Sequence, residues 1–487
     1  MDRVHGLLHA AGRVYAGGPA EPALRVATAR LGEPLRVAIA GRIKAGKSTL
    51  LNALVGHQLA ATDAGECTRV VTWYVDGVDY RAMVHPRGGG PARQLPFRRT
   101  GGAVEIDLDG VPPATVDRLV VSWPSETLRR MTLVDTPGLG SADAEVSARG
   151  EAVLAPGNGE VADADAVVYL MRHVHSDDAA FLEAFRDASP DHRTITTIGV
   201  LARADEVGHA RPDALASAAR VAARYRADPR VNALCRTVVP VAGLLAASAA
   251  GLRESDHRAL ALLAGHEDAD RLLRTADRLV TAETTLDLPG AARRALVARF
   301  GLFGVRRSVA LIREHRARTA SDLARALAAE SGVAGLQELL ATQFTARADV
   351  LKARSALAAL DAVLHRHPVP AAGPLVAEAE RLRAGAHEFA ELSLVDDLRS
   401  RRIRLGAADS EATRDAERLL GASGPDVRTR LALDPATDAE AVRHAAGEQH
   451  RRWQRRAEHP ATTREVARAA RVLVRTCEGL LAVPPRP

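Results

Sequence analysis

Residues 41–48 constrain this chain more than any other stretch. They read G-R-I-K-A-G-K-S and fit the spacing G-x-x-x-x-G-K-S, a loop whose backbone N–H groups surround the phosphates of a bound nucleotide. The hydrophobic run 35–40 before the loop predicts a buried strand, and residues 49–55 after it predict a helix. A helix that starts here points its positive end at the phosphates. This order of strand, loop and helix predicts an α/β domain with a nucleotide site.

The two lysines of this loop are the most informative cations in the sequence. Of 66 lysines and arginines only three are lysines, and two of these, Lys44 and Lys47, lie in the loop. A compact ammonium fits between phosphate oxygens where a planar guanidinium is awkward. We expect Lys47 to reach the β- and γ-phosphates and the Ser48 hydroxyl to bind Mg²⁺. The predicted nucleotide-binding residues of this part are Gly41, Ile43, Lys44, Ala45, Gly46, Lys47, Ser48 and Thr49.

A second motif supplies the expected partner of the metal. Residues 131–138 read M-T-L-V-D-T-P-G, a hydrophobic strand that ends in D-T-P-G. We expect Asp135 to hold Mg²⁺ through water and the N–H of Gly138 to reach the γ-phosphate, although D-T-P-G by itself also suits a plain β-turn. Between the two motifs, Thr68 is preferred over Thr62 and Thr72 as the threonine that binds Mg²⁺ and the γ-phosphate. The alternative for Thr68 is a threonine that merely leads into a strand.

Residues 201–205, L-A-R-A-D, end a predicted strand and are the candidates for base selection. Asp205 is expected to accept the N1 and N2 protons of guanine, and the stem of Arg203 to stack on the base. The usual form of this motif is N/T-K-x-D, so Ala202 and Arg203 depart from it; the alternative is an aspartate that caps a helix. After the next predicted strand, the backbone of Ala242 and Gly243 is expected to face guanine O6.

The catalytic residues follow less directly from the motifs. Leu139 stands after D-T-P-G, so the glutamine that orients water in small regulatory GTPases is missing. Lys44, inside the phosphate loop, is therefore the candidate for a cationic finger that stabilises charge on the γ-phosphoryl group. The alternative is a solvated surface lysine. The predicted catalytic set is Lys44, Thr68 and Gly138, and the predicted metal ligands are Ser48, Thr68 and Asp135.

Composition limits the remaining classes of protein. Aromatic residues make up 3% and hydrophobic residues 47% of the chain, which favours close-packed helices of Ala, Leu and Val. The net charge of +6 permits contact with acidic lipid or nucleic acid, but nucleic-acid binding is disfavoured because stacking aromatics are scarce. Cys67, Cys235 and Cys477 are widely separated and predict free thiols in a reducing, cytoplasmic compartment. The N-terminus does not read as a secretory signal, and the longest uncharged run, 237–252, is shorter than the roughly 20 residues of a membrane-spanning helix.

The pattern of strands and helices divides the chain into three parts. Residues 1–33 are expected to form helices that pack with the C-terminal helices. Residues 34–255 alternate strand-like and helical runs, which predicts a mostly parallel sheet wrapped by helices, with hairpins from residues 76–125 at one edge. Residues 256–487 show helical periods only, and 334–365 are expected to form one helix of about 45–50 Å in a bundle core. The predicted fold is an α/β P-loop GTPase domain plus an extended all-α helical bundle, which the resemblance described next implies to be a neck and trunk.

With these residues placed, the sequence resembles the bacterial dynamin-like GTPases, most of all the actinobacterial, isoniazid-inducible branch. The resemblance rests on G-R-I-K-A-G-K-S, D-A-G-E-C-T-R at 63–69, D-T-P-G and L-A-R-A-D. It implies multimer-stimulated hydrolysis of GTP with Mg²⁺ as cofactor, dimerisation across the nucleotide, and a helical trunk whose tip touches lipid. Lys44 departs from the family, in which a serine near this position helps to place a charge-compensating cation; the lysine ammonium is expected to replace that cation.

The sequence and the resemblance together predict a cytoplasmic GTPase that associates peripherally with the inner face of the cell membrane and remodels or divides it. The expected partners are anionic membrane lipids and either a second copy of the chain or a paralogous dynamin-like protein. The alternative is a GTP-dependent scaffold or regulatory switch that binds a protein partner without remodelling membrane.

Two segments that mix arginines with aliphatic residues, 398–405 and 427–431, are the candidate contacts with anionic headgroups. In the first, Arg401, Arg402 and Arg404 are the expected contacts, and a solvated helix face is the alternative. His173 and His175 lie near Asp177 and Asp178; a polar loop is preferred there over a metal site.

Overall fold

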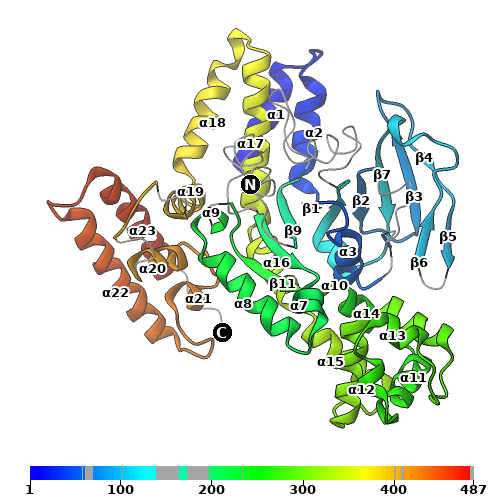
Figure 1. The fold of residues 1–487 in the computed structure, drawn as a ribbon. Coiled ribbons are helices and arrows are strands. Elements are labelled where there is room, and N and C mark those ends of the chain that lie inside the picture. Colours follow the sequence, from blue (N-terminus) through cyan, green and yellow to red (C-terminus); the bar gives the residue numbers. More distant parts are fainter. Residues whose placement is uncertain are drawn as a thin grey trace.

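The computed structural model describes residues 1–57, 59–60, 70–100, 103–138, 164–172, 197–232, 234–399, 402–406 and 411–482. A nine-stranded sheet in the order β11-β10-β9-β1-β8-β2-β7-β3-β4 forms its centre (Figure 1). The neighbours β11, β10, β9, β1 and β8 all run parallel, whereas β2 pairs antiparallel with β8. The strands are β1 (Leu35–Gly41), β2 (Thr72–Val75), β3 (Arg81–Pro86), β4 (Arg93–Gln94), β7 (Val116–Ser122), β8 (Met131–Asp135), β9 (Ala166–Met171), β10 (Thr197–Ala202) and β11 (Val238–Val241).

Successive side chains of β1 belong alternately to two hydrophobic cores, one on each face of the sheet. Val37 and Ile39 share a buried cluster with leucines of α3 (Lys47–Val55) and α16 (Val333–Gln343). Ala38 and Ala40 belong to a second cluster that includes the alanines of α8 (Ala214–Ala227). Successive side chains of a strand point to opposite faces, and a strand buried on both faces is hydrophobic throughout. This explains why β1 is buried along its whole length and why Arg36 is its only charged residue.

The edge of the sheet carries the expected hairpins. β3 pairs antiparallel with β4 and β7, and β5 (Phe97–Thr100) pairs with β6 (Ala103–Ile106) as a separate ribbon. β7 also lies within the residues expected to form these hairpins, but it pairs parallel with β2 and is a strand of the main sheet. The short helices around the sheet are α4 (Glu126–Arg130), α7 (Val207–Ala210), α9 (Pro229–Asn232) and α10 (Gly243–Ala250), with a 3₁₀ turn η4 (Ala204–Glu206).

All elements described after β11 are helical, as the sequence predicts. The first of them share buried clusters with strands of the sheet as far as Leu351, so this packing continues past the expected domain boundary at residue 255. Those between Glu254 and Glu330 form the lower right of Figure 1, whereas α16 lies near its centre beside β11. They are α11 (Glu254–Gly265), α12 (Ala269–Leu272), α13 (Ala276–Thr281), α14 (Gly290–Arg313) and α15 (Ala320–Glu330), followed by α16.

Two further hydrophobic clusters lie outside the sheet. α1 (Asp2–Val14) and α2 (Glu21–Gly32) share a cluster with α17 (Ala348–Arg366) and α18 (Gly373–Gly385), and these helices stand side by side at the top of Figure 1. The second cluster joins the last five helices, which we call the C-terminal unit, on the left of Figure 1. Its helices are α19 (His387–Arg399), α20 (Glu411–Leu419), α21 (Val427–Leu431), α22 (Ala439–Glu458) and α23 (Arg464–Ala482).

The prediction of a single helix over residues 334–365 is wrong. α16 ends at Gln343, a 3₁₀ turn η5 (Thr345–Arg347) follows, and α17 starts at Ala348. Phe344 is fully buried in the cluster shared with the sheet, and the backbone of Arg347 leaves the helical region with φ −118° and ψ 13°. Helical periodicity alone does not show this break, because both halves have the same 3.6-residue pattern.

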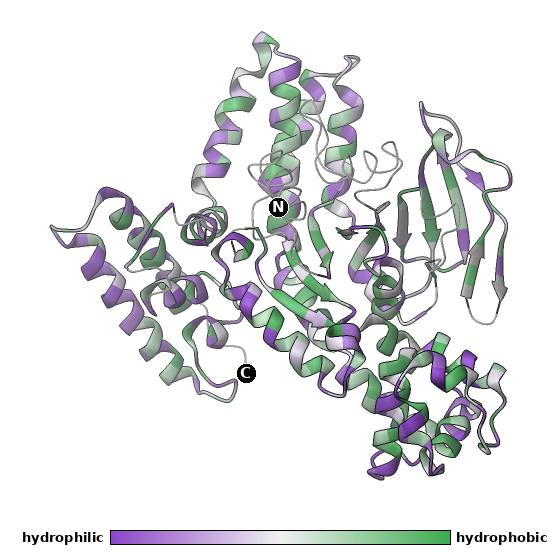
Figure 2. Cartoon of the chain, in the orientation of Figure 1, coloured by the Kyte–Doolittle hydropathy of each residue, from purple (hydrophilic) through white to green (hydrophobic). Residues whose placement is uncertain are grey.

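Figure 2 shows hydrophobic and hydrophilic residues mixed along the outer helices. None of the described helices is both long and apolar enough to cross a membrane. Cys235 and Cys477 are buried and form no disulfide, and Cys67 lies outside the described residues.

Candidate nucleotide site

The phosphate loop lies at the carboxyl end of β1, between β9 and β8. Gly41 has a φ of +145°, and a Cβ there would lie 2.5 Å from the Leu170 carbonyl oxygen of β9, so only glycine fits. Gly46, with a φ of +101°, precedes α3. Parallel strands end at one edge of a sheet, where helix N-termini meet. The loop therefore presents the start of α3 at the edge where ligands bind in this class of fold.

Lys47, Ser48 and Asp135 come together at this edge. Asp135 ends β8 directly beside Ile39 of β1, because the two residues are partners in the strand register. The Ser48 hydroxyl donates to Asp135 Oδ2 over 3.3 Å. Lys47 Nζ donates to the carbonyl oxygens of Gly41 (3.0 Å) and Arg42 (3.3 Å). Burial lowers the pKa of Lys47, while the charge of Asp135 raises it.

The oxygen atoms of this group suit Mg²⁺. Burial raises the pKa of Asp135 to about 6, against the opposing effects of the Lys47 charge and the Ser48 hydrogen bond. Among the described residues, Asp135 Oδ1 is buried without a hydrogen-bond partner. A buried carboxylate oxygen with unused lone pairs, next to a hydroxyl, is the kind of hard donor that Mg²⁺ takes directly or through water. Ser48 and Asp135 therefore fit the metal, whereas the third predicted ligand, Thr68, lies outside the described residues.

The D-T-P-G segment is held against the phosphate loop. Thr136 donates through its N–H (3.3 Å) and its hydroxyl (3.0 Å) to the carbonyl oxygen of Ile39. A Cβ on Gly138 would lie 2.5 Å from Ile43 Cγ1 and 3.0 Å from Ile43 Cα. The two segments therefore approach closely enough that a side chain at Gly138 would displace the loop. Leu139 lies outside the described residues.

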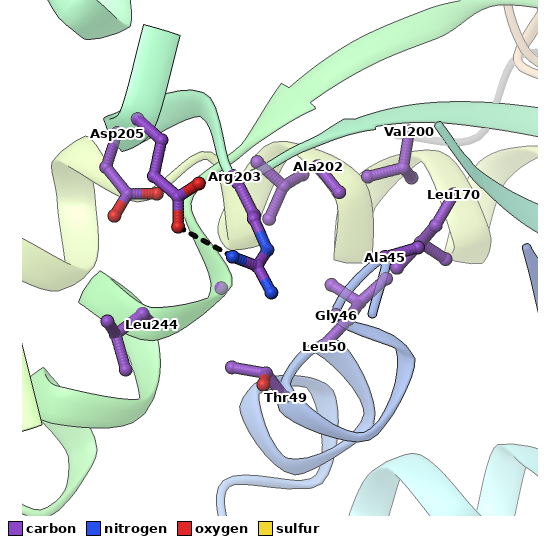
Figure 3. Close-up of a pocket in the computed structure, with 13 residues that line it drawn as sticks. Ala45, Gly46, Thr49, Leu50, Leu170, Val200, Ala202, Arg203, Asp205 and Leu244 are labelled. Carbon is purple, nitrogen blue, oxygen red and sulfur yellow. Dashed lines mark hydrogen bonds and ion pairs between the residues drawn. The ribbon is translucent and has the colours of Figure 1, made fainter. Parts of the chain in front are cut away.

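A pocket of about 180 Å³ adjoins the phosphate loop (Figure 3). Asp205 lines it and is buried, and burial raises the pKa of its carboxyl group. Thr49 and Leu50 of α3 form one wall, and the β10 end with Arg203 forms the opposite wall. A buried carboxylate in a largely apolar slot is suited to accept paired N–H groups of a flat base. The other lining residues are Ala45, Gly46, Leu170, Val200, Ala202, Glu206, Val241, Gly243 and Leu244.

Arg203 links this pocket to the phosphate loop. Its Nη2 donates to the carbonyl oxygen of Lys44 over 3.0 Å, and its Nη1 pairs with Glu206 over 2.9 Å. Glu206 also pairs with Arg172 at the end of β9 over 2.6 Å. Sequence reasoning missed Glu206 and Arg172; the available signal was the i, i+3 spacing of Arg203 and Glu206.

Of the predicted residues Lys44, Ala242 and Gly243, only Gly243 lines the pocket. Lys44 is exposed and has a left-handed backbone, with a φ of +61°. Gly243 lines the pocket, but the N–H of Ala242 donates to the Ser331 carbonyl oxygen over 2.8 Å. The Ala242 N–H is therefore engaged elsewhere in this structure, against the expectation that it faces guanine O6, and of these two residues only Gly243 lines the pocket.

The two basic segments expected to touch lipid are largely occupied within the C-terminal unit. Arg399 is buried, pairs with Glu417 over 3.1 Å and donates to the Arg236 carbonyl oxygen over 2.8 Å. Arg430 pairs with Glu391 and donates to the Leu419 carbonyl oxygen. Arg402 pairs with Asp397 over 2.8 Å, Arg404 is exposed, and Arg401 lies outside the described residues. Arg399, Arg402 and Arg430 thus make contacts within the protein, whereas Arg404 remains exposed. The segment with His173, His175, Asp177 and Asp178 also lies outside the described residues.

The chain is similar to known proteins, one of them over almost its whole length. The model of the dynamin family matches residues 37–75. The isoniazid-induced protein IniC of Mycobacterium tuberculosis is 40% identical over 492 aligned positions, which cover 99% of this chain and 98% of that protein. A bacterial dynamin-like protein of Nostoc punctiforme is 31% identical over 147 positions, 28% of this chain and 20% of its own length.

Solved structures of an oligomerised bacterial dynamin pair, described as sensing and tethering membranes, align with 98% and 95% of this chain. The alignments cover 74% and 86% of those chains, at 12% and 11% identity and TM-scores of 0.28 and 0.30.

Proposed function

Because the chain belongs to the bacterial dynamin-like GTPases, in the isoniazid-induced branch, we propose that it binds GTP with Mg²⁺ and hydrolyses it to GDP and phosphate. The single observation that carries the proposal is the convergence of Lys47, Ser48 and Asp135, whose Oδ1 has no hydrogen-bond partner among the described residues, beside a base-sized pocket that contains Asp205. Phosphate, metal and base recognition thus lie along one edge of the sheet.

Each residue has a defined task in this proposal. Lys47 leaves the carbonyl oxygens of Gly41 and Arg42 and donates to the β- and γ-phosphates. The ionised carboxylate of Asp205 accepts hydrogen bonds from the N1–H and N2–H groups of guanine, while the side chain of Arg203 stacks on the base. Ser48, Asp135 and Thr68 would hold Mg²⁺, which would supply positive charge to offset that of the phosphates. Water attacks the γ-phosphorus in line with the bridging oxygen, whose bond to the γ-phosphorus breaks as GDP leaves, and the N–H of Gly138 donates a hydrogen bond to a γ-phosphate oxygen.

Lys44 is the proposed cationic finger. The backbone of Lys44 is left-handed, and the guanidinium of Arg203 donates a hydrogen bond to the Lys44 carbonyl oxygen. The backbone is therefore held in place, and the exposed ammonium is the part of the residue that can move. We expect Lys44→Ala to lower kcat at least roughly 100-fold while the affinity for GTP changes only several-fold. Lys44→Arg, which keeps the charge, should retain part of the activity. Single-turnover hydrolysis and calorimetric binding measure the two quantities, and an unchanged kcat in Lys44→Ala would remove this role.

At the level of the whole protein, we propose nucleotide-dependent association of the GTPase domains, with a second copy or a paralogous dynamin-like partner, and peripheral binding to anionic lipid on the inner face of the cell membrane. Three parts, residues 1–33, 34–255 and 256–487, would couple hydrolysis to membrane remodelling or fission. The whole-length match to IniC and the local match to a bacterial dynamin-like protein support this.

The second candidate is a GTP-dependent scaffold or switch that binds a protein without deforming membrane. Electron microscopy of vesicles containing anionic lipid, incubated with the protein and GTP, separates the two candidates. Tubulated or divided vesicles with GTP, and smooth vesicles with Lys44→Ala, support remodelling. Smooth vesicles under all conditions, despite normal GTP hydrolysis, favour the scaffold.

A further inference from the structure

A second pocket lies far from the nucleotide site, at the turn between α22 and α23. This turn forms the outer end of the C-terminal unit (Figure 1). The pocket has a volume of about 490 Å³, within the range of small-molecule sites. Its lining combines arginines, a histidine and two threonines and includes no carboxylate: Arg452, Arg455, Arg456, His459, Ala461, Thr462, Thr463 and Val466.

The positive charge of this pocket is only partly compensated. Arg452 pairs with Asp415 over 2.9 Å, but Asp415 also pairs with Arg418 over 2.8 Å, so one carboxylate serves two guanidinium groups. Arg456 donates to the Leu405 carbonyl oxygen, which fixes the side chain without neutralising its charge. In the part of the chain that the structure describes, Arg455 is exposed and makes no ion pair or hydrogen bond.

The neighbouring carboxylates do not cancel this charge. Glu458, outside the lining, accepts a hydrogen bond from the Gln454 amide over 3.2 Å. Glu465 is exposed in the first turn of α23. Neither pairs with Arg455 or Arg456 among the described residues, so the pocket remains a positively charged concave surface.

The other lining groups are hydrogen-bond donors. The N–H of Ala461 donates to His459 Nδ1 over 3.2 Å, which places the ring proton of the neutral imidazole on Nε2, where it is available to an acceptor. The Thr463 hydroxyl accepts from the Val466 N–H over 3.4 Å and keeps its own proton. α23, which begins at Arg464, adds the positive end of a 19-residue helix.

We propose that this pocket binds a phosphate group, carried either by a membrane lipid headgroup or by a soluble phosphate ester. Arginine forks match the geometry of phosphate oxygens and form charge-assisted hydrogen bonds with them. Arg455 and Arg456 supply the forks, His459 Nε2 and the Thr463 hydroxyl donate single hydrogen bonds, and the helix end favours the negative charge. The site is independent of the proposed GTPase function; its lipid form alone rests on the proposed association with membrane.

Arg455→Glu is the informative variant, because Arg455 has no ion pair or hydrogen bond to lose among the residues that the structure describes. Arg451→Glu is the matched control: Arg451 is exposed on the same helix, lies outside the pocket and changes the net charge equally. The protein is first saturated with Mg²⁺ and GDP so that the phosphate loop does not bind the probe. Calorimetry then measures binding of glycerol 1-phosphate, and flotation measures binding to vesicles of phosphatidylcholine with or without phosphatidylglycerol.

We expect Arg455→Glu to weaken binding roughly tenfold or more, since a charge is both lost and reversed, and Arg451→Glu to weaken it far less. Binding to phosphatidylglycerol vesicles that glycerol 1-phosphate competes away assigns the site to lipid; binding of glycerol 1-phosphate without vesicle binding assigns it to a soluble ester. Equal losses in the two variants, or binding of neither probe by the unmodified protein, would overturn the site. GTP hydrolysis measured in parallel should be the same for both variants, which separates this test from that of the nucleotide site.

Discussion

At the scale of single residues, Asp135 shows how the nucleotide site is prepared for a metal. Its carboxyl group is buried, one oxygen accepts from Ser48, and the other has no partner among the described residues. Burial is the largest influence and raises its pKa to about 6. A group with a raised acid pKa favours folding while it is protonated in both states. In the unfolded chain, the carboxyl group ionises at the usual pKa of an aspartate, whereas in the folded chain it stays protonated up to about pH 6. The contribution of Asp135 to stability is therefore lost as the pH rises between these two pKa values.

The raised pKa of Asp135 predicts that metal binding depends on pH. Without metal, ionisation of Asp135 costs the folded chain on the order of 3 kcal/mol, and a bound Mg²⁺ offsets that cost. We expect the affinity for Mg²⁺ and GDP to rise as pH increases through about 6, and binding near pH 6 to release a proton. Calorimetry in buffers of different ionisation enthalpy measures both.

Asp135→Asn is the control for this prediction. It should bind Mg²⁺ and GDP weakly and lack the part of the pH dependence that belongs to this carboxyl group. The same pH profile in both proteins would show that the nucleotide phosphates, rather than Asp135, titrate.

At the scale of elements, the third lysine of the chain joins the N-terminal helices to α17. Lys352 Nζ donates to the carbonyl oxygens of Leu31 (2.9 Å) and Glu33 (3.1 Å) at the end of α2. The last carbonyl groups of a helix lack partners within the helix, and a cation there also interacts favourably with the helix dipole. Lys352 therefore caps α2 from a segment more than three hundred residues away in the sequence.

We expect Lys352→Met to lower the free energy of unfolding by about 2 kcal/mol, because the side chain is largely buried and two carbonyl groups lose a charged donor. Arg3→Met is the comparison, since Arg3 joins α1 to Glu378 of α18 by an exposed ion pair, and its loss should cost less than about 1 kcal/mol. Chemical denaturation measures both. Similar losses would argue against the capping role.

At the scale of the whole molecule, a cluster of three arginines fastens the C-terminal unit to the sheet and to the α16–α17 break. Arg236, just before β11, donates to the carbonyl oxygens of Gly421 (2.8 Å) and Ala422. Arg347 donates to the same Gly421 oxygen over 2.6 Å, and Arg399 donates to the Arg236 carbonyl oxygen over 2.8 Å. Burial lowers the pKa of Arg236 well below its usual value, and the charges of Arg347 and Arg399 add to this.

Gly421 is the point on which this contact depends. Its φ is +80°, and a Cβ there would lie 2.3 Å from Arg347 Nη2 and 3.1 Å from the Gly424 carbonyl oxygen. We expect Gly421→Ala to destabilise the protein by about 2 kcal/mol or more and to make the C-terminal unit easier to release. Thermal unfolding and small-angle scattering measure the two effects.

Gly479→Ala in α23 is the matched control, because a Cβ there meets no atom within 4 Å. It should leave stability unchanged or raise it slightly, since alanine favours helix over glycine. An equal loss of stability in both variants would show that Gly421 has no special role in the contact with the arginine cluster.

Local patterns in the sequence determined the α/β and helical fold class, the strand before the phosphate loop and the motifs of the nucleotide site. These features depend on residues close together in the chain, where hydrophobic periodicity and glycine spacing are readable. The same reasoning proposed the division into three parts, and the dynamin family model matches residues 37–75, a stretch that contains the phosphate loop.

Only the tertiary structure decided which groups are available for binding. Arg399 and Arg430 look in the sequence like solvated cations, but distant acids and carbonyl groups occupy them. Glu206 became part of the site because folding brings Arg203 to the carbonyl oxygen of Lys44, and the break after α16 exists because Phe344 packs into the core of the sheet. Each of these outcomes depends on contacts between residues far apart in the chain. Side-chain periodicity carries no information about such contacts, because it records only which face of an element is apolar.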